Sequence, residues 1–92
     1  MRTNRKTLEA IVGWINTAIG IPEGSQLWTT RDGKNHATIG MMYLDHNISG
    51  FQLERMSNDG GGVTIIIYRS PASSMENQLR AFHRGLTYSV NP

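Results

Sequence analysis

The chain has 92 residues, of which 38% are hydrophobic and 17% are charged, and its formal net charge is +2. This length fits one small domain spanning residues 1–92, and the absence of cysteine excludes disulfides, thiolate metal sites and cysteine nucleophiles. No apolar run approaches the roughly 18 residues of a membrane span, and the first residues lack the apolar core of a signal peptide, so we expect a cytoplasmic protein without membrane contacts.

The N-terminal part of the chain predicts an amphipathic helix. Thr7 is a favourable N-cap residue, and residues 1–6 before it are expected to form a basic tail. Gly20 and Pro22 then stop the helix. The helical spacing is carried by five apolar residues: Leu8, Ile11, Val12, Ile15 and Ile19.

Two positions of this helix carry further expectations. Gly13 inside a helix costs roughly 1 kcal/mol relative to alanine, so we expect it to permit close packing. Asn16 falls away from the apolar stripe, on the face that also carries Glu9 and Thr17. We therefore expect Asn16 on the polar side of the helix.

The middle of the chain predicts strands. Asp32-Gly33 marks a hairpin turn. The last strand, 63–68, is almost wholly apolar, which predicts a central strand covered on both faces or a strand held against a partner. The connecting loops are too short for crossovers, so we expect one antiparallel meander of four strands. These strands are 27–31, 36–44, 51–56 and 63–68.

A second amphipathic helix follows. Ser73 and Glu76 form the pattern of a capping box, and Gly85 is expected to end the helix before a loose tail at 87–92. The apolar stripe consists of Met75, Leu79, Phe82 and Leu86. The predicted fold is therefore α+β in the order α-β-β-β-β-α, with the N-terminal and C-terminal helices packed on one face of the sheet and the other face open.

No pattern in the sequence indicates catalysis, a metal or a cofactor. Asp45, His46 and Ser49 resemble a triad only superficially, because neighbouring residues do not supply the required geometry and are ordinary turn formers. The Gly60–Gly62 run could cradle a phosphate, but it matches no phosphate-binding motif and a flexible hairpin explains it better. The three histidines do not have the spacing of a metal-binding motif. They are His36, His46 and His83.

The basic residues carry the most useful functional signal. Seven of the nine are arginines, whose planar guanidinium suits phosphate, carboxylate and interface contacts. Arg80 and Arg84 are four apart on the predicted solvent face of the last helix, and with Arg69 just before it they could form a basic patch or simply a solvated face. The predicted partner-binding or nucleic-acid-binding residues are Arg31, Lys34 and Asn35 at the hairpin tip and Arg69, Arg80 and Arg84 near the last helix.

Short motifs occur along residues 8–86: Ile15-Asn16, Gly20-Ile21-Pro22, Trp28-Thr29, Asp32-Gly33, Ile39-Gly40, Tyr43-Leu44-Asp45, the run Gly50–Met56, the run Gly60–Val63 and the run Leu79–Leu86. In these motifs the chain resembles a family of small phage-encoded proteins, mostly of unassigned function. The matching motifs are turns, core positions and helix stops, and they mark no catalytic residue. The chain departs from the family pattern in the loop 45–50 and at Ile65–Ile67.

This resemblance implies a non-enzymatic phage protein that acts in the host cytoplasm by binding a component of host defence. The leading hypothesis is an anti-CRISPR inhibitor that blocks a Cas effector and its guide RNA from target DNA. One alternative is a sponge for a cyclic nucleotide signal, which would use the Gly60–Gly62 turn and would oligomerise, with the apolar strand 63–68 suited to the interface. Another is a small DNA-binding regulator, which a steep salt dependence would identify.

Overall fold

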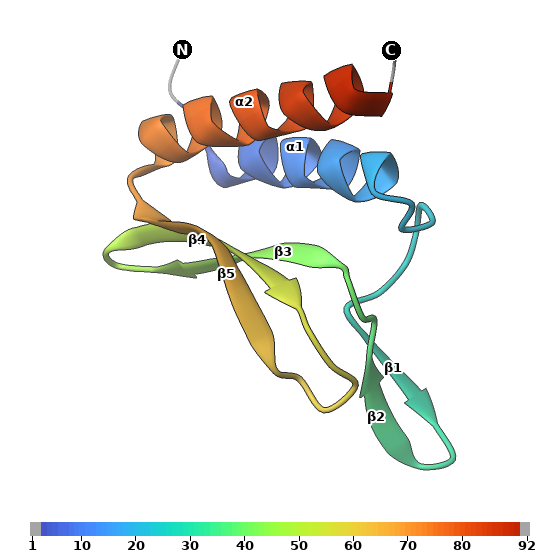
Figure 1. The fold of residues 1–92 in the computed structure, drawn as a ribbon. Helices are drawn as coiled ribbons and strands as arrows, with labels where there is room; N and C mark the ends of the chain where they lie inside the picture. The colour runs from blue at the N-terminus through green and yellow to red at the C-terminus, as the bar shows by residue number, and fades with distance from the viewer. Residues whose placement is uncertain (1–2, 91–92) are drawn as a thin grey trace.

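A computed structural model describes residues 3–90 of the chain, with side chains up to residue 88, and shows an α+β fold. Two helices lie side by side and run in the same direction above a sheet, and a separate hairpin projects away from the helices (Figure 1). Within the described residues no helix is long and apolar enough to cross a membrane. The elements are α1 (Arg5–Ala18), β1 (Trp28–Arg31), β2 (Lys34–Ala37), β3 (Met42–Asn47), β4 (Gly50–Met56), β5 (Val63–Ser70) and α2 (Ala72–Val90).

The described strands form two antiparallel sheets, so the prediction of one four-stranded meander is wrong. β1 pairs with β2, and β3, β4 and β5 form a second sheet in that order. The predicted strand 36–44 is broken because the chain turns at Thr38–Met41, where the Met41 N–H donates to the Thr38 carbonyl. Gly40 in this turn has φ +88°. Residues within a β-strand have negative φ, so the strand cannot continue through Gly40.

The central strand is β4, and the prediction that the apolar strand 63–68 is central is also wrong. β5 lies at the edge of the three-stranded sheet, paired on one side only. Val63, Ile65 and Tyr68 of this strand are exposed. The pairing register shifts twice along β5, so its side chains do not alternate regularly between the two faces.

The core lies between the helices and one face of the three-stranded sheet, as the apolar stripes predicted. Figure 1 shows both helices on the same side of this sheet. Burying these side chains supplies the main stabilising force, at about 25 cal/mol per Å² of apolar surface. The core residues are Leu8, Ile11, Val12, Ile15, Met42, Phe51, Leu53, Met75 and Leu79.

The first helix begins earlier than the sequence indicated. Asn4 is the N-cap, and its side-chain oxygen accepts the Thr7 N–H at 3.0 Å, so Thr7 lies inside the helix. Thr3 donates to the Glu76 carboxylate of α2 at 2.5 Å. The predicted tail 1–6 is therefore ordered from residue 3, and its first two residues lie outside the described part. Gly20 has φ +91° just after the helix, as the predicted stop requires.

The second helix is longer than predicted at both ends. It begins at Ala72, and the Glu76 carboxylate accepts hydrogen bonds from Thr3 and Arg80, so the capping box does not form. Gly85 does not end the helix, because Leu86 beyond it packs against the core and extends the buried stripe. The predicted loose tail is helical as far as residue 90, while 91–92 lie outside the described residues.

Asn16 is buried, not on the polar side of α1. Its side-chain amide donates to the Met42 carbonyl at 2.9 Å and accepts the Met42 N–H at 2.8 Å. The side chain thus completes both hydrogen bonds of the first residue of β3 and fixes α1 against the sheet edge. Gly13, in contrast, is exposed, and a Cβ built on it would meet nothing within 4 Å. The expectation of close packing at Gly13 is wrong.

Candidate functional site

The first candidate surface is the tip of the β1–β2 hairpin. Asp32 and Gly33 have φ values of +53° and +74°, which is the backbone of the tight turn that the Asp-Gly pair predicted. Arg31 pairs in register with Lys34 across the strands, and both are exposed. Asn35 follows, and its side-chain oxygen accepts the Thr30 hydroxyl at 3.0 Å. Two cations therefore lie opposite each other at the end of a projecting arm.

The base of this hairpin is attached to the turn between β4 and β5. The Ala37 N–H donates to the Asp59 carbonyl at 3.1 Å, and the His36 Nδ1 atom lies 2.7 Å from a carboxylate oxygen of Asp59. The Trp28 ring lies against Gly61, where a Cβ would approach the ring to 2.7 Å. Contacts from both strands of the hairpin thus hold the arm in one position.

The same turn does not offer a phosphate cradle. The N–H groups of Gly60 and Gly62 both donate to the side-chain oxygen of Asn58, at 3.0 and 2.9 Å. The Gly61 N–H donates to the Asn58 carbonyl. The donors that an anion would need are therefore used within the turn. The glycines serve the packing of Trp28 and Asn58 instead.

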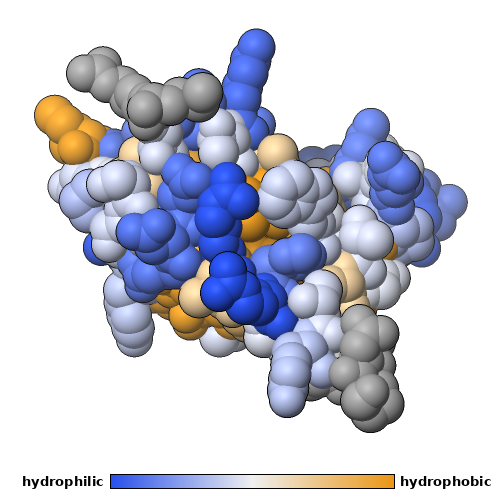
Figure 2. Space-filling model, turned by 90° about the horizontal axis from the view of Figure 1, so that it is seen from above, coloured by the Kyte–Doolittle hydropathy of each residue, from blue (hydrophilic) through white to orange (hydrophobic). Residues whose placement is uncertain are grey.

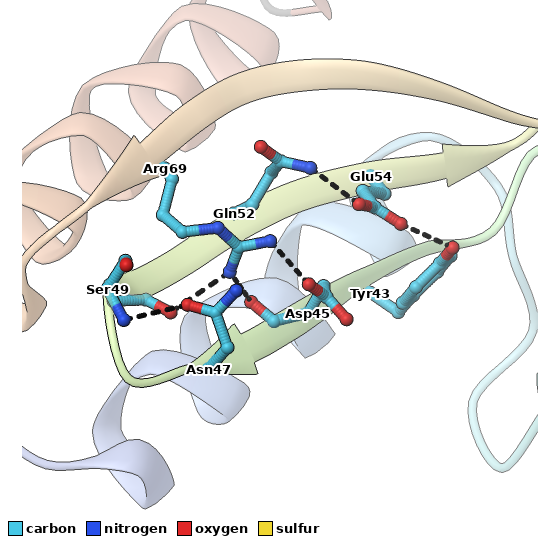
Figure 3. A network of polar contacts seen from close by, with 8 residues as sticks. Tyr43, Asp45, Asn47, Ser49, Gln52, Glu54 and Arg69 are labelled. Atoms are coloured by element: carbon cyan, nitrogen blue, oxygen red, sulfur yellow. Dashed lines mark hydrogen bonds and ion pairs between the residues drawn. The ribbon is translucent and has the colours of Figure 1, made fainter.

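Arg69 lies apart from the other predicted binding residues. From β5 its guanidinium donates to the Asp45 carboxylate at 2.5 Å and to the carbonyls of Asp45 and Gly50 at 3.1 and 3.0 Å. These contacts lie on the open face of the three-stranded sheet (Figure 3). The guanidinium bridges β5 to β3 across the start of β4, so it is not part of a patch with Arg80 and Arg84.

Three further polar side chains of this open face also contact one another. The Tyr43 hydroxyl donates to the Glu54 carboxylate at 2.7 Å, and the Gln52 amide donates to its second oxygen at 2.6 Å (Figure 3). Burial, the hydrogen bond and the nearby Glu54 charge raise the pKa of the Tyr43 hydroxyl above its ordinary value. Tyr43 therefore remains a neutral donor, and Glu54 accepts hydrogen bonds from both of its neighbours.

The second candidate surface is a groove between the two helices. Figure 2 looks onto the helix layer, where hydrophilic side chains predominate and hydrophobic areas show between them. Trp14 is 49% exposed, and the centroid of its ring lies 5.9 Å from that of His83 on α2. Arg80 is held by Glu76 at 2.8 Å, while Arg84 is exposed. The lining residues are Ile11, Trp14, Arg80, His83, Arg84 and Thr87.

The structure divides the predicted binding residues into three places. Arg31, Lys34 and Asn35 lie together at the hairpin tip, Arg80 and Arg84 line the helix groove, and Arg69 holds the sheet. Sequence reasoning missed Trp14 and His83, although a tryptophan at the flank of an apolar stripe is a signal for a half-exposed ring.

The described residues contain no assembled catalytic triad. The Asp45 carboxylate binds Arg69, and the His46 ring stacks on Phe51 with centroids 4.1 Å apart. The Ser49 N–H closes the β3–β4 turn on Asn47, in keeping with the turn-forming character of this segment. Among these residues no three histidine or carboxylate side chains gather to hold a metal.

The chain matches no protein-family model, no curated protein and no solved structure. The fold and the two surfaces define a small α+β domain with cationic side chains on a projecting hairpin and along a groove between its helices.

Proposed function

We propose that this protein acts by binding an anionic partner and not by catalysis. In its specific form, the proposal is a phage-encoded anti-CRISPR protein that blocks a Cas effector with its guide RNA from target DNA. The observation that carries the binding role is the hairpin tip, where Arg31 and Lys34 lie opposite each other in an exposed cross-strand pair. Like charges in this position destabilise a hairpin, so an anionic partner is a physical reason for both to be there.

The position of the tip supports this role. The hairpin projects from the side of the molecule that faces away from the helices (Figure 1), and the molecule measures 45 × 40 × 20 Å. A standard interface covers about 800 Å² on each partner, against a total surface of 6215 Å². An interface of this size covers only part of the surface, so charge reversals at the tip and at the helix groove test the two places separately.

The test is affinity purification of the tagged protein from a lysate with an active CRISPR system, with and without nuclease. We expect a stoichiometric ribonucleoprotein that survives nuclease treatment. The double substitution Arg31→Glu and Lys34→Glu should reduce its recovery at least tenfold, because it replaces attraction by repulsion at the tip. The matched control is Arg5→Glu with Lys6→Glu, which makes the same charge change in the first turn of α1.

Three outcomes would contradict the proposal or its parts. Equal recovery with both double variants would remove the hairpin tip from the interface. Recovery of nucleic acid alone, with an affinity that falls steeply as salt rises, would replace the inhibitor by a DNA-binding regulator. Recovery of no macromolecule would overturn the proposal.

A further inference from the structure

Trp14 is unusual among the large side chains of α1. Its neighbours Ile11 and Ile15 on the same helix are fully buried, whereas 49% of Trp14 is exposed. The ring lies near His83 of α2, with centroids 5.9 Å apart and the two ring planes tilted by 48°. A half-exposed indole is a surface on which another flat ring can stack.

The charges around this ring favour an anion. Arg80, His83 and Arg84 line the groove, and none of the described lining residues is acidic. The Glu76 carboxylate on α2 accepts hydrogen bonds from Thr3 and Arg80. Glu23 lines a separate pocket that Trp14 also borders. Arg84 is exposed, and it lies four positions after Arg80 on the same helix.

The size of the groove argues against an enclosed small molecule. Its volume is about 210 Å³, below the roughly 300–1,000 Å³ of typical small-molecule pockets. One base could rest on the indole while the rest of a longer strand follows the surface past the arginines. Combining aromatic platforms with a cationic track is the general mode by which proteins bind single strands without reading their sequence.

We propose that the groove between α1 and α2 binds one nucleotide unit of single-stranded nucleic acid, with its base stacked on Trp14 and an adjacent phosphate at Arg84. This inference goes beyond the proposed function, because it requires no Cas effector and no host protein. Stacking without base-edge contacts makes the site tolerant of sequence.

The test uses tryptophan fluorescence. The chain has two tryptophans, and Trp28→Phe leaves Trp14 as the single reporter. Titration with oligouridine or oligothymidine of twelve nucleotides should quench this fluorescence in a saturable way, because a stacked base quenches the fluorescence of the indole. In the otherwise unchanged chain, Trp14→Ala should weaken binding of a labelled oligonucleotide about 5- to 150-fold, as loss of one base–aromatic stack does. Arg84→Glu should also weaken oligonucleotide binding, and the loss of affinity should be larger at low salt than at high salt.

Tyr68→Ala is the matched control, because Tyr68 is an aromatic residue with 75% exposure on β5, away from the groove. It should leave binding unchanged. The absence of saturable quenching, or equal binding by Trp14→Ala and Tyr68→Ala, would overturn the inference. If oligonucleotides bind through Trp14 while no ribonucleoprotein is purified from the lysate, the groove stands and the anti-CRISPR proposal fails. If a ribonucleoprotein is recovered equally well with Trp14→Ala and no quenching occurs, the anti-CRISPR proposal stands and the groove fails.

Discussion

Arg69 holds three strands together through a single side chain. Its guanidinium has acceptors from Asp45 and Gly50, and 22% of the side chain is exposed. We expect Arg69→Ala to lower the free energy of unfolding by about 1.5–3 kcal/mol, the usual range for hydrogen bonds to a charged group. Arg69→Lys should recover less than half of this loss, because an ammonium cannot present the same planar set of donors. Urea denaturation measures both values, and a loss below about 0.5 kcal/mol would show that the bridge is not structural.

The buried Asn16 side chain is expected to contribute to the stability of the fold. Asn16→Ala would leave the N–H and carbonyl of Met42 without their buried partner. We expect a loss of about 1–3 kcal/mol in the free energy of unfolding. Thr17→Ala on the exposed side of the same turn should change it by less than about 0.5 kcal/mol. Equal effects of the two substitutions in urea denaturation would contradict the role of Asn16.

The pKa of the Glu76 carboxyl lies below its ordinary value, because Thr3 and then Arg80 donate hydrogen bonds to the carboxylate. A group with a lowered folded-state pKa stabilises the fold above its unfolded-state pKa, about 4.3 for glutamate, and loses this contribution as the pH falls through the folded-state pKa. The stability difference between the natural chain and Glu76→Gln should therefore shrink as the pH falls below about 4.3. Unfolding curves over a pH series check this, and a difference that grows on acidification would contradict it.

At the scale of elements, we expect alanine to have opposite effects on stability at two glycine positions. Gly13 lies inside α1 with open space around it, whereas Gly50 has φ +122° and a Cβ there would collide with the Ser70 carbonyl. We expect Gly13→Ala to stabilise the protein by about 0.5–1 kcal/mol, which raises Tm by several degrees for a domain of this size. Gly50→Ala should lower Tm. A thermal melt of each variant decides, and destabilisation by Gly13→Ala would mean that the exposed position contacts something else.

The elements also show where prediction from sequence succeeds. The apolar stripes of both helices and the Asp32-Gly33 turn are local patterns, and the structure contains all three. The ends of the helices were missed because distant groups decide them. Thr3 and Glu76 bond across the two helices, and Leu86 carries α2 past Gly85. Neither contact can be recognised from the residues next to the helix end in the sequence.

At the scale of the whole molecule, the two candidate surfaces lie on different elements around one small core. The groove at Trp14 lies between the two helices. The hairpin that carries Arg31 and Lys34 projects away from the helices (Figure 1). The core and the Asp59 contacts of the hairpin hold this arrangement. The sequence indicated the cations of the tip together, because they are neighbours in one turn. The sequence suggested that Arg69 could form a patch with Arg80 and Arg84. Arg69 instead contacts Asp45, which only the pairing of the strands brings close to it.

The sequence by itself determined that the chain forms two amphipathic helices around antiparallel strands, with a cationic hairpin tip, since period, turn residues and charge are local properties. The tertiary structure alone decided that β4 is central, that Arg69 clamps the sheet, and that Trp14 and His83 meet across a groove. Each of these depends on which distant segments pack together. That choice is made by burial of the shared core, in which many side chains contribute at once and no single motif records the result.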